Sequence, residues 1–356
     1  MRRKIRVLIA DDSALMRREL RRIMEGDPDI EVVASVRNGQ EAVEQTKFLD
    51  PDVVALDINM PVMDGLTALQ YIMMEAPRPV VMISSLTQEG ALTTYEALEL
   101  GAVDFVGKPS GTISKDIAKV AEEIIYKIHS AAGANTSNLR LRTRRRAWPR
   151  ERKVTAVQPK IRSSQKIVII GQSTGGPNTI MDIIPFLPAN LGVPVIIVQH
   201  MPASFTPSFA QRLDKICAFP FKEAKSGDLL EPNHGYLAPG DIHMTLAPRG
   251  LGKNGALVRL TRIPRDTLHT PSVDVTMESV LAYYGSNTIA VLLTGMGADG
   301  ANAMAKIRQA GGRTIAESEK TAVVFGMPKE AIKRGGAEFV LPSYEIADKI
   351  VELVKS

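Results

Sequence analysis

The sequence predicts an α/β protein made of two doubly wound parallel-sheet domains. Short apolar runs alternate with amphipathic helical patterns in two separate series, and a polar stretch divides the series. The length of 356 residues is also too great for one ordinary core and suits two domains. We therefore expect domains at residues 1–130 and 165–356, joined by a basic linker at 131–164.

The elements follow from these runs in order. In the first domain, apolar runs begin at Val7, Val53, Val80 and Val103, and a helical pattern over 117–128 predicts an amphipathic closing helix. In the second domain, strands are expected at 167–170, 193–198 and 289–293, with later strands in 311–316 and 337–341. Residues 220–275 contain many Pro and Gly residues, which predicts hairpins and loops.

Composition and charge exclude several classes of protein. No apolar stretch approaches the roughly 18 residues of a membrane span, and the basic start is followed by too short an apolar run for a signal peptide. The single cysteine, Cys217, excludes an internal disulfide framework. The net charge of +5 arises from the arginine-rich segment 140–162, while the rest of the chain is net acidic. We expect a cytoplasmic protein whose basic run is a solvated linker rather than a nucleic-acid surface.

Acidic residues follow the strands of the first domain. Asp11 and Asp12 come after the first run and Asp57 after the next, and Ser84 and Lys108 follow later strands. The carboxyl ends of parallel strands share one edge of a sheet, so we expect these side chains to converge. Three converging carboxylates favour a divalent cation such as Mg²⁺, which pairs well with phosphate oxygens. Asp57 can then be a nucleophile that becomes an acyl phosphate.

The same residues resemble a known family. The motifs are ADDS at 10–13, LDINMPVMDG at 56–65, ISS at 83–85 and DFVGKP at 104–109. Together they resemble the response-regulator receiver domain, which implies a flavodoxin-like fold. The resemblance implies Asp57 as phosphoacceptor and a Mg²⁺ site of Asp11, Asp12, Asp57 and Asn59, the last through its backbone carbonyl. It also implies a phosphate switch made of the Ser84 hydroxyl, the Phe105 ring and Lys108.

The strands of the second domain end in different chemistry. Ser173 follows the first strand within a glycine-rich turn, His200 follows the second, and Asp299 follows the strand at 289–293. A serine hydroxyl becomes a good nucleophile when an imidazole takes its proton, and a carboxylate fixes the tautomer of that imidazole. Backbone N–H groups of the turn at 174–176 and of the turn around Met296 can stabilise a negatively charged intermediate. The pattern predicts a Ser–His–Asp hydrolase.

These residues also admit other interpretations. Ser173 occupies a position where the dinucleotide fingerprint requires glycine, which disfavours a phosphate-binding loop. His200 can be a structural histidine and Asp299 a helix cap. The string Gly171-x-Ser173-x-Gly175 fits a nucleophile elbow, but α/β-hydrolases order their triad Ser, acid, His. The order Ser, His, Asp favours a different scaffold. His234, His243 and His269 have no standard metal-binding spacing.

Six motifs of the second domain resemble one esterase family. They are GQSTGGP at 171–177, VQHMP at 198–202, YLAPGD at 236–241, PSVDV at 271–275, LLTGMGADG at 292–300 and VFGMP at 324–328. With the preceding receiver they resemble the chemotaxis protein-glutamate methylesterases of the CheB type, which implies a Rossmann-like α/β esterase domain.

The resemblance implies phosphorylation-activated hydrolysis of glutamate methyl esters on chemoreceptors, with release of methanol, and deamidation of receptor glutamines. It implies Ser173 as nucleophile, His200 as base and Asp299 as the orienting acid, with Met296 and Thr174 in the oxyanion and substrate site. No cofactor is implied for ester hydrolysis. The partners implied are chemoreceptors and a chemotaxis histidine kinase as phosphodonor, with membranes reached only through the receptors.

The sequence departs from the family at two places, and two other functions stay open. Gln172 replaces a small residue before the nucleophile, and His269-Thr270 replaces an arginine common before PSVD. One alternative is a regulator whose second domain binds a partner without catalysis, although all three triad residues are present. The other is a DNA-binding regulator, suggested by the arginine run, but the sequence has no recognition-helix pattern.

Overall fold

A computed structural model describes residues 3–84, 88–108, 115–135, 166–250 and 255–356. The chain forms two compact units, Met1–Arg146 and Ala147–Ser356. The predicted linker at 131–164, with its arginine run, lies almost wholly outside the described residues, and its boundaries stay a prediction. Among the described helices, none combines the length and the apolar character needed to cross a membrane.

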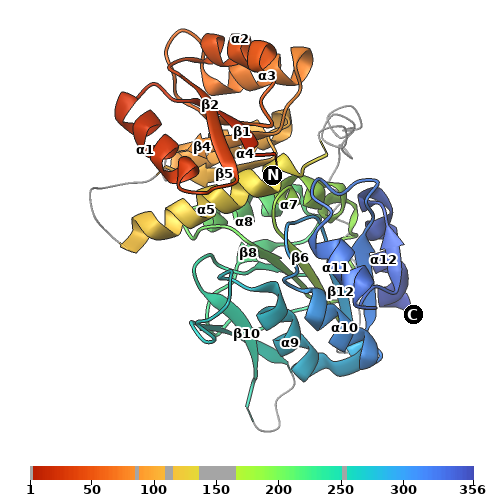
Figure 1. Cartoon of the computed structure of the whole chain (residues 1–356). Helices are drawn as coiled ribbons and strands as arrows, with labels where there is room; N and C mark the ends of the chain where they lie inside the picture. The colour runs from red at the N-terminus through yellow and green to blue at the C-terminus, as the bar shows by residue number, and fades with distance from the viewer. Residues whose placement is uncertain (1–2, 85–87, 109–114, 136–165, 251–254) are drawn as a thin grey trace. The chain divides into compact units, whose positions relative to one another are not determined.

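The first unit alternates strands and helices in the way the apolar runs predict (Figure 1). Its elements are β1 (Ile5–Ala10), α1 (Ala14–Glu25), β2 (Ile30–Val36), α2 (Gly39–Leu49), β3 (Val53–Asp57), α3 (Gly65–Glu75), β4 (Val80–Ser84), α4 (Gln88–Leu100), β5 (Asp104–Gly107) and α5 (Lys115–Ala132). Side chains begin three of the helices: Ser13, Asn38 and Asp64 each accept a hydrogen bond from a backbone N–H of the first turn.

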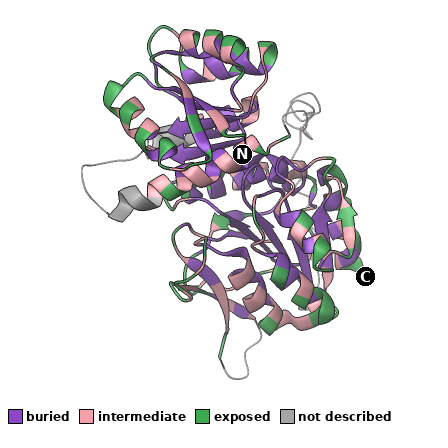
Figure 2. Ribbon diagram, in the orientation of Figure 1, coloured by how far each residue is buried: buried purple, intermediate pink, exposed green. Residues whose placement is uncertain are grey.

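The sheet of this unit has the order β2-β1-β3-β4-β5, and its strand pairs are parallel. Strands β3, β4 and β5 are buried along their whole length, as a sheet covered on both faces requires (Figure 2). The order reverses at β1 and β3, so the residues that follow these two strands face one crevice. Asp11 and Asp57 are therefore neighbours.

The second unit is a larger α/β domain. Its elements are β6 (Ile167–Gln172), α7 (Gly176–Thr179), the 3₁₀ turns η1 (Ile180–Asp182) and η2 (Ile184–Phe186), β7 (Val195–Gln199), α8 (Thr206–Ile216), β8 (Phe221–Glu223), β9 (Gly235–Leu237), β10 (His243–Pro248), β11 (Ala256–Thr261), α9 (Val273–Tyr284), η3 (Gly285–Asn287), β12 (Thr288–Leu292), α10 (Ala301–Gln309), β13 (Arg313–Glu317), α11 (Met327–Lys333), β14 (Phe339–Leu341) and α12 (Ser343–Lys355).

Seven parallel strands form its sheet in the order β14-β13-β12-β6-β7-β9-β8. From β6 the chain moves to β7 on one side, and later enters β12 on the other side. The switch point therefore lies between β6 and β12, where open α/β sheets bind their ligands. Buried side chains of α9, α10 and α11 pack with those of β6, β7 and β12 in one core, which holds these strand ends in place.

The prediction for residues 220–275 was wrong in part. Strands β10 and β11 pair in antiparallel fashion, whereas β8 and β9 join the main sheet as parallel strands. Each of the two has three residues, too few for a periodic pattern to be recognised in the sequence. The later strands predicted in 311–316 and 337–341 are present as β13 and β14.

Candidate functional site

Ser173 lies in a tight turn that follows β6. Gly175 in this turn has φ of +78°, and a Cβ atom there would lie 2.6 Å from Cβ of Val323, so only glycine fits. The helix expected after the turn is broken: α7 spans four residues and continues as two 3₁₀ turns. The turn presents Ser173 at the switch point of the sheet, and the serine is fully buried.

His200 follows β7 at the position in the strand register that corresponds to Ser173 after β6. Gln172 of β6 pairs with Gln199 of β7, and the His200 N–H donates to the Gln172 carbonyl at 3.2 Å. The Gln199 amide Nε2 donates to the carbonyls of both Ser173 and His200, at 3.1 and 3.0 Å. The strand register and this amide together hold the two residues next to each other.

Asp299 follows β12 and binds the N-terminus of a different helix, α9. Its Oδ1 accepts from the Ser272 hydroxyl at 2.9 Å and from the Asp274 N–H at 3.0 Å. Its Oδ2 accepts from the Val273 N–H at 2.7 Å and from His200 Nε2 at 2.8 Å. Burial alone would raise the pKa of Asp299, but the bond and charge of His200 and the α9 N–H groups outweigh it and hold this pKa well below its usual value. Asp299 is thus an ionised carboxylate at the positive end of a helix.

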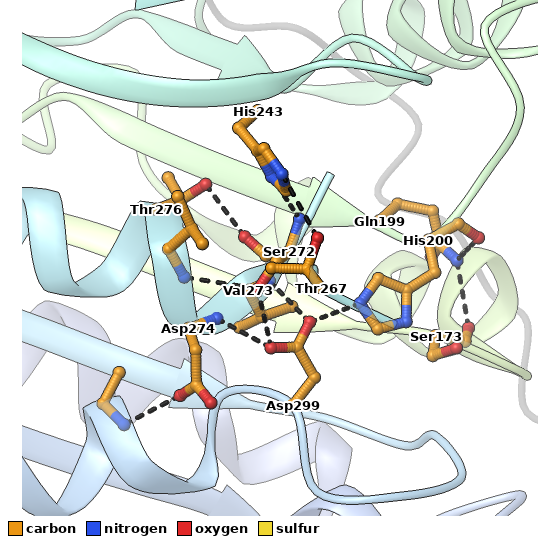
Figure 3. Close-up of polar contacts among 12 residues, drawn as sticks. Ser173, Gln199, His200, His243, Thr267, Ser272, Val273, Asp274, Thr276 and Asp299 are labelled. Carbon is orange, nitrogen blue, oxygen red and sulfur yellow. Dashed lines mark hydrogen bonds and ion pairs between the residues drawn. The ribbon is translucent and has the colours of Figure 1, made fainter. Parts of the chain in front are cut away.

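These contacts assign the two ring nitrogens of His200. An ionised Asp299 only accepts, so Nε2 carries the proton and donates to it, and Nδ1 keeps its lone pair. The ring lies between the Asp299 carboxylate and Ser173 (Figure 3). His200 Nδ1 and Ser173 Oγ are both buried, and neither finds a hydrogen-bond partner among the described residues. This base and this hydroxyl lie at the same end of the sheet, an arrangement that is suited to nucleophilic attack by the serine.

The turn that carries Met296 lies against the serine. A Cβ atom on Gly295 would lie 2.7 Å from Ser173 Cβ, so the absence of a side chain at Gly295 permits this close approach. Met296 is half-buried in this turn, and the Thr174 hydroxyl beside Ser173 is buried without a hydrogen-bond partner in the described chain.

The expectation for backbone donors was too broad. The Gly176 N–H donates to Ser173 O at 2.8 Å, and the Gly295 N–H donates to Val324 O at 3.0 Å. Both groups are therefore occupied inside the protein and are not available to a bound substrate. Within the turn after the nucleophile, this leaves the N–H groups of Thr174 and Gly175 as the candidates.

Sequence reasoning singled out Gln172 and His269 but did not predict how they and Ser272 surround the triad. The imidazole of His269 stacks on that of His200, with ring centroids 4.0 Å apart and ring planes 24° apart. Ser272 begins α9 and also binds Asp299. Gln172 is fully buried beside Gln199 and Gly176. The motif PSVDV at 271–275 was the only signal in the sequence for the residues that hold Asp299.

Asp274 and Asp299 cap each other's helices, and this predicts a pH effect. Asp274 lies in the first turn of α9 and accepts from the Ala303 N–H of α10 at 2.8 Å. Burial, with a contribution from the Asp299 charge, raises the pKa of Asp274 from 3.8 to about 6. Because an acid with a raised pKa binds its proton more tightly in the folded state, its contribution to stability is complete below pH 3.8 and is lost as the pH rises through about 6.

Asp274→Asn keeps an acceptor for the Ala303 N–H and removes the charge. We expect the unfolding temperature of this variant, relative to wild type, to rise between about pH 4 and pH 6 and then to stay level. Thermal unfolding measured across this range checks the expectation. Asp348→Asn, an exposed acid on α12, is the control and should run parallel to wild type. A parallel curve for Asp274→Asn would mean that Asp274 does not titrate in this window.

The receiver residues also converge. Carboxylate oxygens of Asp11, Asp12 and Asp57 lie within 4.8 Å of one another, with Asp11 and Asp57 buried and Asp12 exposed. Lys108 Nζ lies 2.8 Å from Asp57 Oδ2 and 3.0 Å from Asp11 Oδ2. Burial raises the pKa of Asp57 although Lys108 opposes this, and bonds to the two carboxylates raise the pKa of Lys108 against its own burial. Such a set of hard oxygen donors beside a lysine fits Mg²⁺ and a phosphoryl group.

The switch residues lie on neighbouring strands. Ser84 is buried at the end of β4 and its hydroxyl accepts from the Thr94 hydroxyl of α4 at 2.8 Å. Phe105 of β5 is buried edge-on against Tyr95, with centroids 6.3 Å apart. Asn59 is exposed two residues beyond Asp57, so its side chain adds nothing to the buried part of the pocket.

Comparisons with known proteins agree with both sites. The family profile described as CheB methylesterase matches residues 168–350, and that of the response regulator receiver domain matches residues 7–118. The chain is 55% identical to protein-glutamate methylesterase/protein-glutamine glutaminase 2 of Carboxydothermus hydrogenoformans, with 99% of each chain covered. It is 45% identical to the protein-glutamate methylesterase/protein-glutamine glutaminase of Thermotoga maritima, again with 99% of each chain covered.

A solved structure matches the second unit. The CheB methylesterase catalytic domain of Thermotoga maritima superposes with a TM-score of 0.51 and 45% identity, covering 53% of this chain and 98% of that one. The identity over the full length, the two family profiles and the geometry of the two strand-end sites agree, and the chain belongs to the CheB methylesterase family, with a response regulator receiver domain at its N-terminal side.

Proposed function

We propose that the chain hydrolyses methyl esters of glutamate side chains on chemoreceptors, releasing methanol, and converts receptor glutamines to glutamates. Ser173 is the nucleophile, His200 the base and Asp299 the acid that orients the base. The observation that carries the proposal is the His200 ring, bound to Asp299 through Nε2 while Nδ1 and Ser173 Oγ are both buried with no hydrogen-bond partner among the described residues. Under this proposal the chain acts in the cytoplasm and reaches membranes only through receptors.

Each step of the reaction uses a group of this site. Ser173 Oγ attacks the ester carbonyl while its proton passes to His200 Nδ1, and Asp299 stabilises the resulting imidazolium. The imidazolium then gives that proton to the departing methoxide, which leaves as methanol. The acyl group stays on Ser173 as an acyl-serine. His200 Nδ1 then takes a proton from a water molecule that attacks the acyl-serine, and it returns this proton to Ser173 Oγ as the acyl–oxygen bond breaks. This step releases the glutamate side chain as a carboxylic acid and regenerates the serine. With a glutamine substrate the same proton transfer releases ammonia.

The oxyanion of each tetrahedral intermediate needs fixed donors. The N–H of Thr174 follows the nucleophile directly, and Gly175 is next in the same rigid turn. Met296 directly follows Gly295, whose backbone approaches Ser173 closely. We assign the oxyanion to the Thr174 side of the turn and substrate contact to Met296. Preorganised donors of this type are worth about 3 to 4 kcal/mol each in a transition state.

The receiver is proposed to control this activity. Asp57 is the phosphoacceptor, and Asp11, Asp12 and the Asn59 backbone carbonyl are proposed to hold Mg²⁺ with it. When bound, the ion neutralises negative charge on the phosphoryl oxygens. Lys108 is placed to bind a phosphoryl oxygen, and the Ser84 hydroxyl can exchange Thr94 for the phosphoryl group. Phe105 then follows as the switch aromatic. A chemotaxis histidine kinase is the proposed phosphodonor.

Asp57→Asn is expected to hold the full chain at its unphosphorylated activity. We expect acetyl phosphate with Mg²⁺ to raise methanol release by wild type about tenfold. A change of this size needs a free-energy difference of only ~1.4 kcal/mol between an active and an inactive state of the chain. Methanol released from methylated receptor membranes measures the effect. Asp64→Asn is the matched control, since Asp64 lies on the same β3–α3 loop and is the exposed N-cap of α3. Equal responses in wild type and Asp57→Asn would remove Asp57 from the phosphoacceptor role.

A further inference from the structure

Residues 262–272, which we name the strap, connect β11 to α9 and contact two members of the triad. Near the end of the strap, the His269 ring stacks on His200 at 4.0 Å between centroids. At the end of the strap, the Ser272 hydroxyl donates to Asp299 at 2.9 Å. The strap therefore contacts both the base and the acid.

One buried histidine outside the triad holds the strap. His243 begins β10 and is 1% exposed. Its Nε2 lies 3.0 Å from the Pro264 carbonyl. The same Nε2 lies 3.3 Å from the Thr267 hydroxyl, and Nδ1 accepts from the Ser272 N–H at 3.1 Å (Figure 3). A single imidazole thus binds the strap at its beginning, its middle and its end.

The contacts assign the protonation of His243. The Ser272 backbone N–H is a donor, so Nδ1 must be the acceptor, and the Pro264 carbonyl is an acceptor, so Nε2 must carry the proton. The ring is neutral and both nitrogens are engaged. Among the described residues, the only group of three or more His, Cys, Asp or Glu side chains arranged for a metal is the receiver cluster, so His243 is not part of such a cluster.

We propose that His243 is a positioning residue for catalysis, acting through the strap. Its Nδ1 holds Ser272, which holds Asp299, and its Nε2 holds Pro264 and Thr267, which lead to His269 and the His200 ring. The inference rests on the proposed ester hydrolysis, because it predicts a change in the kcat of that reaction. A displacement of reacting groups by about 1 Å can cost two orders of magnitude in rate, so a modest shift of the strap has a measurable effect.

Two substitutions separate the two branches of contact. His243→Gln keeps an amide donor near the Pro264 carbonyl and leaves the Ser272 N–H without its acceptor. His243→Asn keeps an acceptor near Ser272 and loses the donor toward Pro264. With a soluble peptide that carries a glutamate methyl ester, we expect His243→Gln to lower kcat about tenfold with KM within about twofold, and His243→Asn to retain more of kcat. His234→Gln, a half-buried histidine of the same unit, is the control and should match wild type.

Double-mutant cycles test the route. If His243 acts through Ser272, then His243→Gln should cost much less in kcat in a Ser272→Ala background than in wild type. In the same way, His243→Asn should cost much less in a His269→Ala background. If in both cycles the fall in kcat of the double variant equals the product of the falls in the two single variants, the proposal is overturned. It is also overturned by a His243→Gln variant that folds and keeps kcat within about twofold of wild type.

A measurement without turnover complements the kinetics. In ¹⁵N spectra of the histidine-labelled full chain, His243 should appear as a neutral ring protonated at Nε2, and this signal should be missing from His243→Asn. A protonated or Nδ1–H ring would overturn the assignment even where a variant failed to fold. If wild type releases no methanol from the peptide, the proposed function fails. If wild type is active and both cycles are multiplicative, only the inference about His243 fails.

Discussion

Ser173→Ala is expected to lower ester hydrolysis about a million-fold while the fold survives. Removing the nucleophile of a serine triad costs about this much, because the remaining groups cannot form the acyl intermediate. The fold should survive because Ser173 Oγ makes no hydrogen bond with the described residues, so alanine leaves no protein group without its partner. The backbone bonds of the turn, from Ser173 N to Thr294 O and from Gly176 N to Ser173 O, do not depend on the side chain.

Methanol release and thermal unfolding of the full chain measure the two halves of this prediction. Ser318→Ala is a matched control, because Ser318 also follows a strand of the same sheet, β13, and its buried hydroxyl likewise has no partner among the described residues. We expect this control to be fully active. If Ser173→Ala unfolded like wild type and kept more than a few per cent of the activity, Ser173 would not be the nucleophile.

Asp299→Asn is expected to lower kcat about ten-thousandfold, with a much smaller change in KM. Comparable losses follow when the acid of a serine triad is neutralised, because the imidazole then takes the wrong tautomer. In this site the reason is geometric. Oδ2 accepts from His200 Nε2 and Val273 N, and Oδ1 accepts from Ser272 Oγ and Asp274 N. In either orientation, an asparagine would direct its NH₂ group at a backbone N–H donor.

The same contacts predict a loss of stability in Asp299→Asn. The variant weakens the cap on α9, which typically costs about 1 kcal/mol. Activity should therefore fall far more than stability, and kinetics and thermal unfolding of one preparation compare the two. Asp228→Asn is a suitable control, since Asp228 also accepts from a backbone N–H, that of Lys225 at 2.7 Å, but belongs to no part of the triad. A fall in kcat of less than about tenfold would remove Asp299 from the proposed role.

The sequence alone was sufficient for the fold class and for which residues lie at the strand ends. Apolar runs of five or six residues, such as β6, β7 and β12, are buried on both faces, and burial of this kind leaves a clear hydrophobic pattern. In a parallel sheet every strand ends at the same edge, so residues with reactive or charged side chains that follow such runs are expected to converge. This reasoning found Ser173, His200 and Asp299, and likewise the acidic residues of the receiver.

Only the tertiary structure decided how those residues are held. The N–H groups that bind Asp299 belong to α9, and their sequence separation from it, 25 or more residues, leaves no periodic trace. The ring nitrogen of His200 that faces Ser173, the stack of His269 and the clamp of His243 on the strap depend on packing between distant elements. Local sequence patterns indicate whether a segment is buried and whether it forms a helix or a strand. They do not report which distant helix end or side chain comes to lie opposite, because that is set by how the whole core closes.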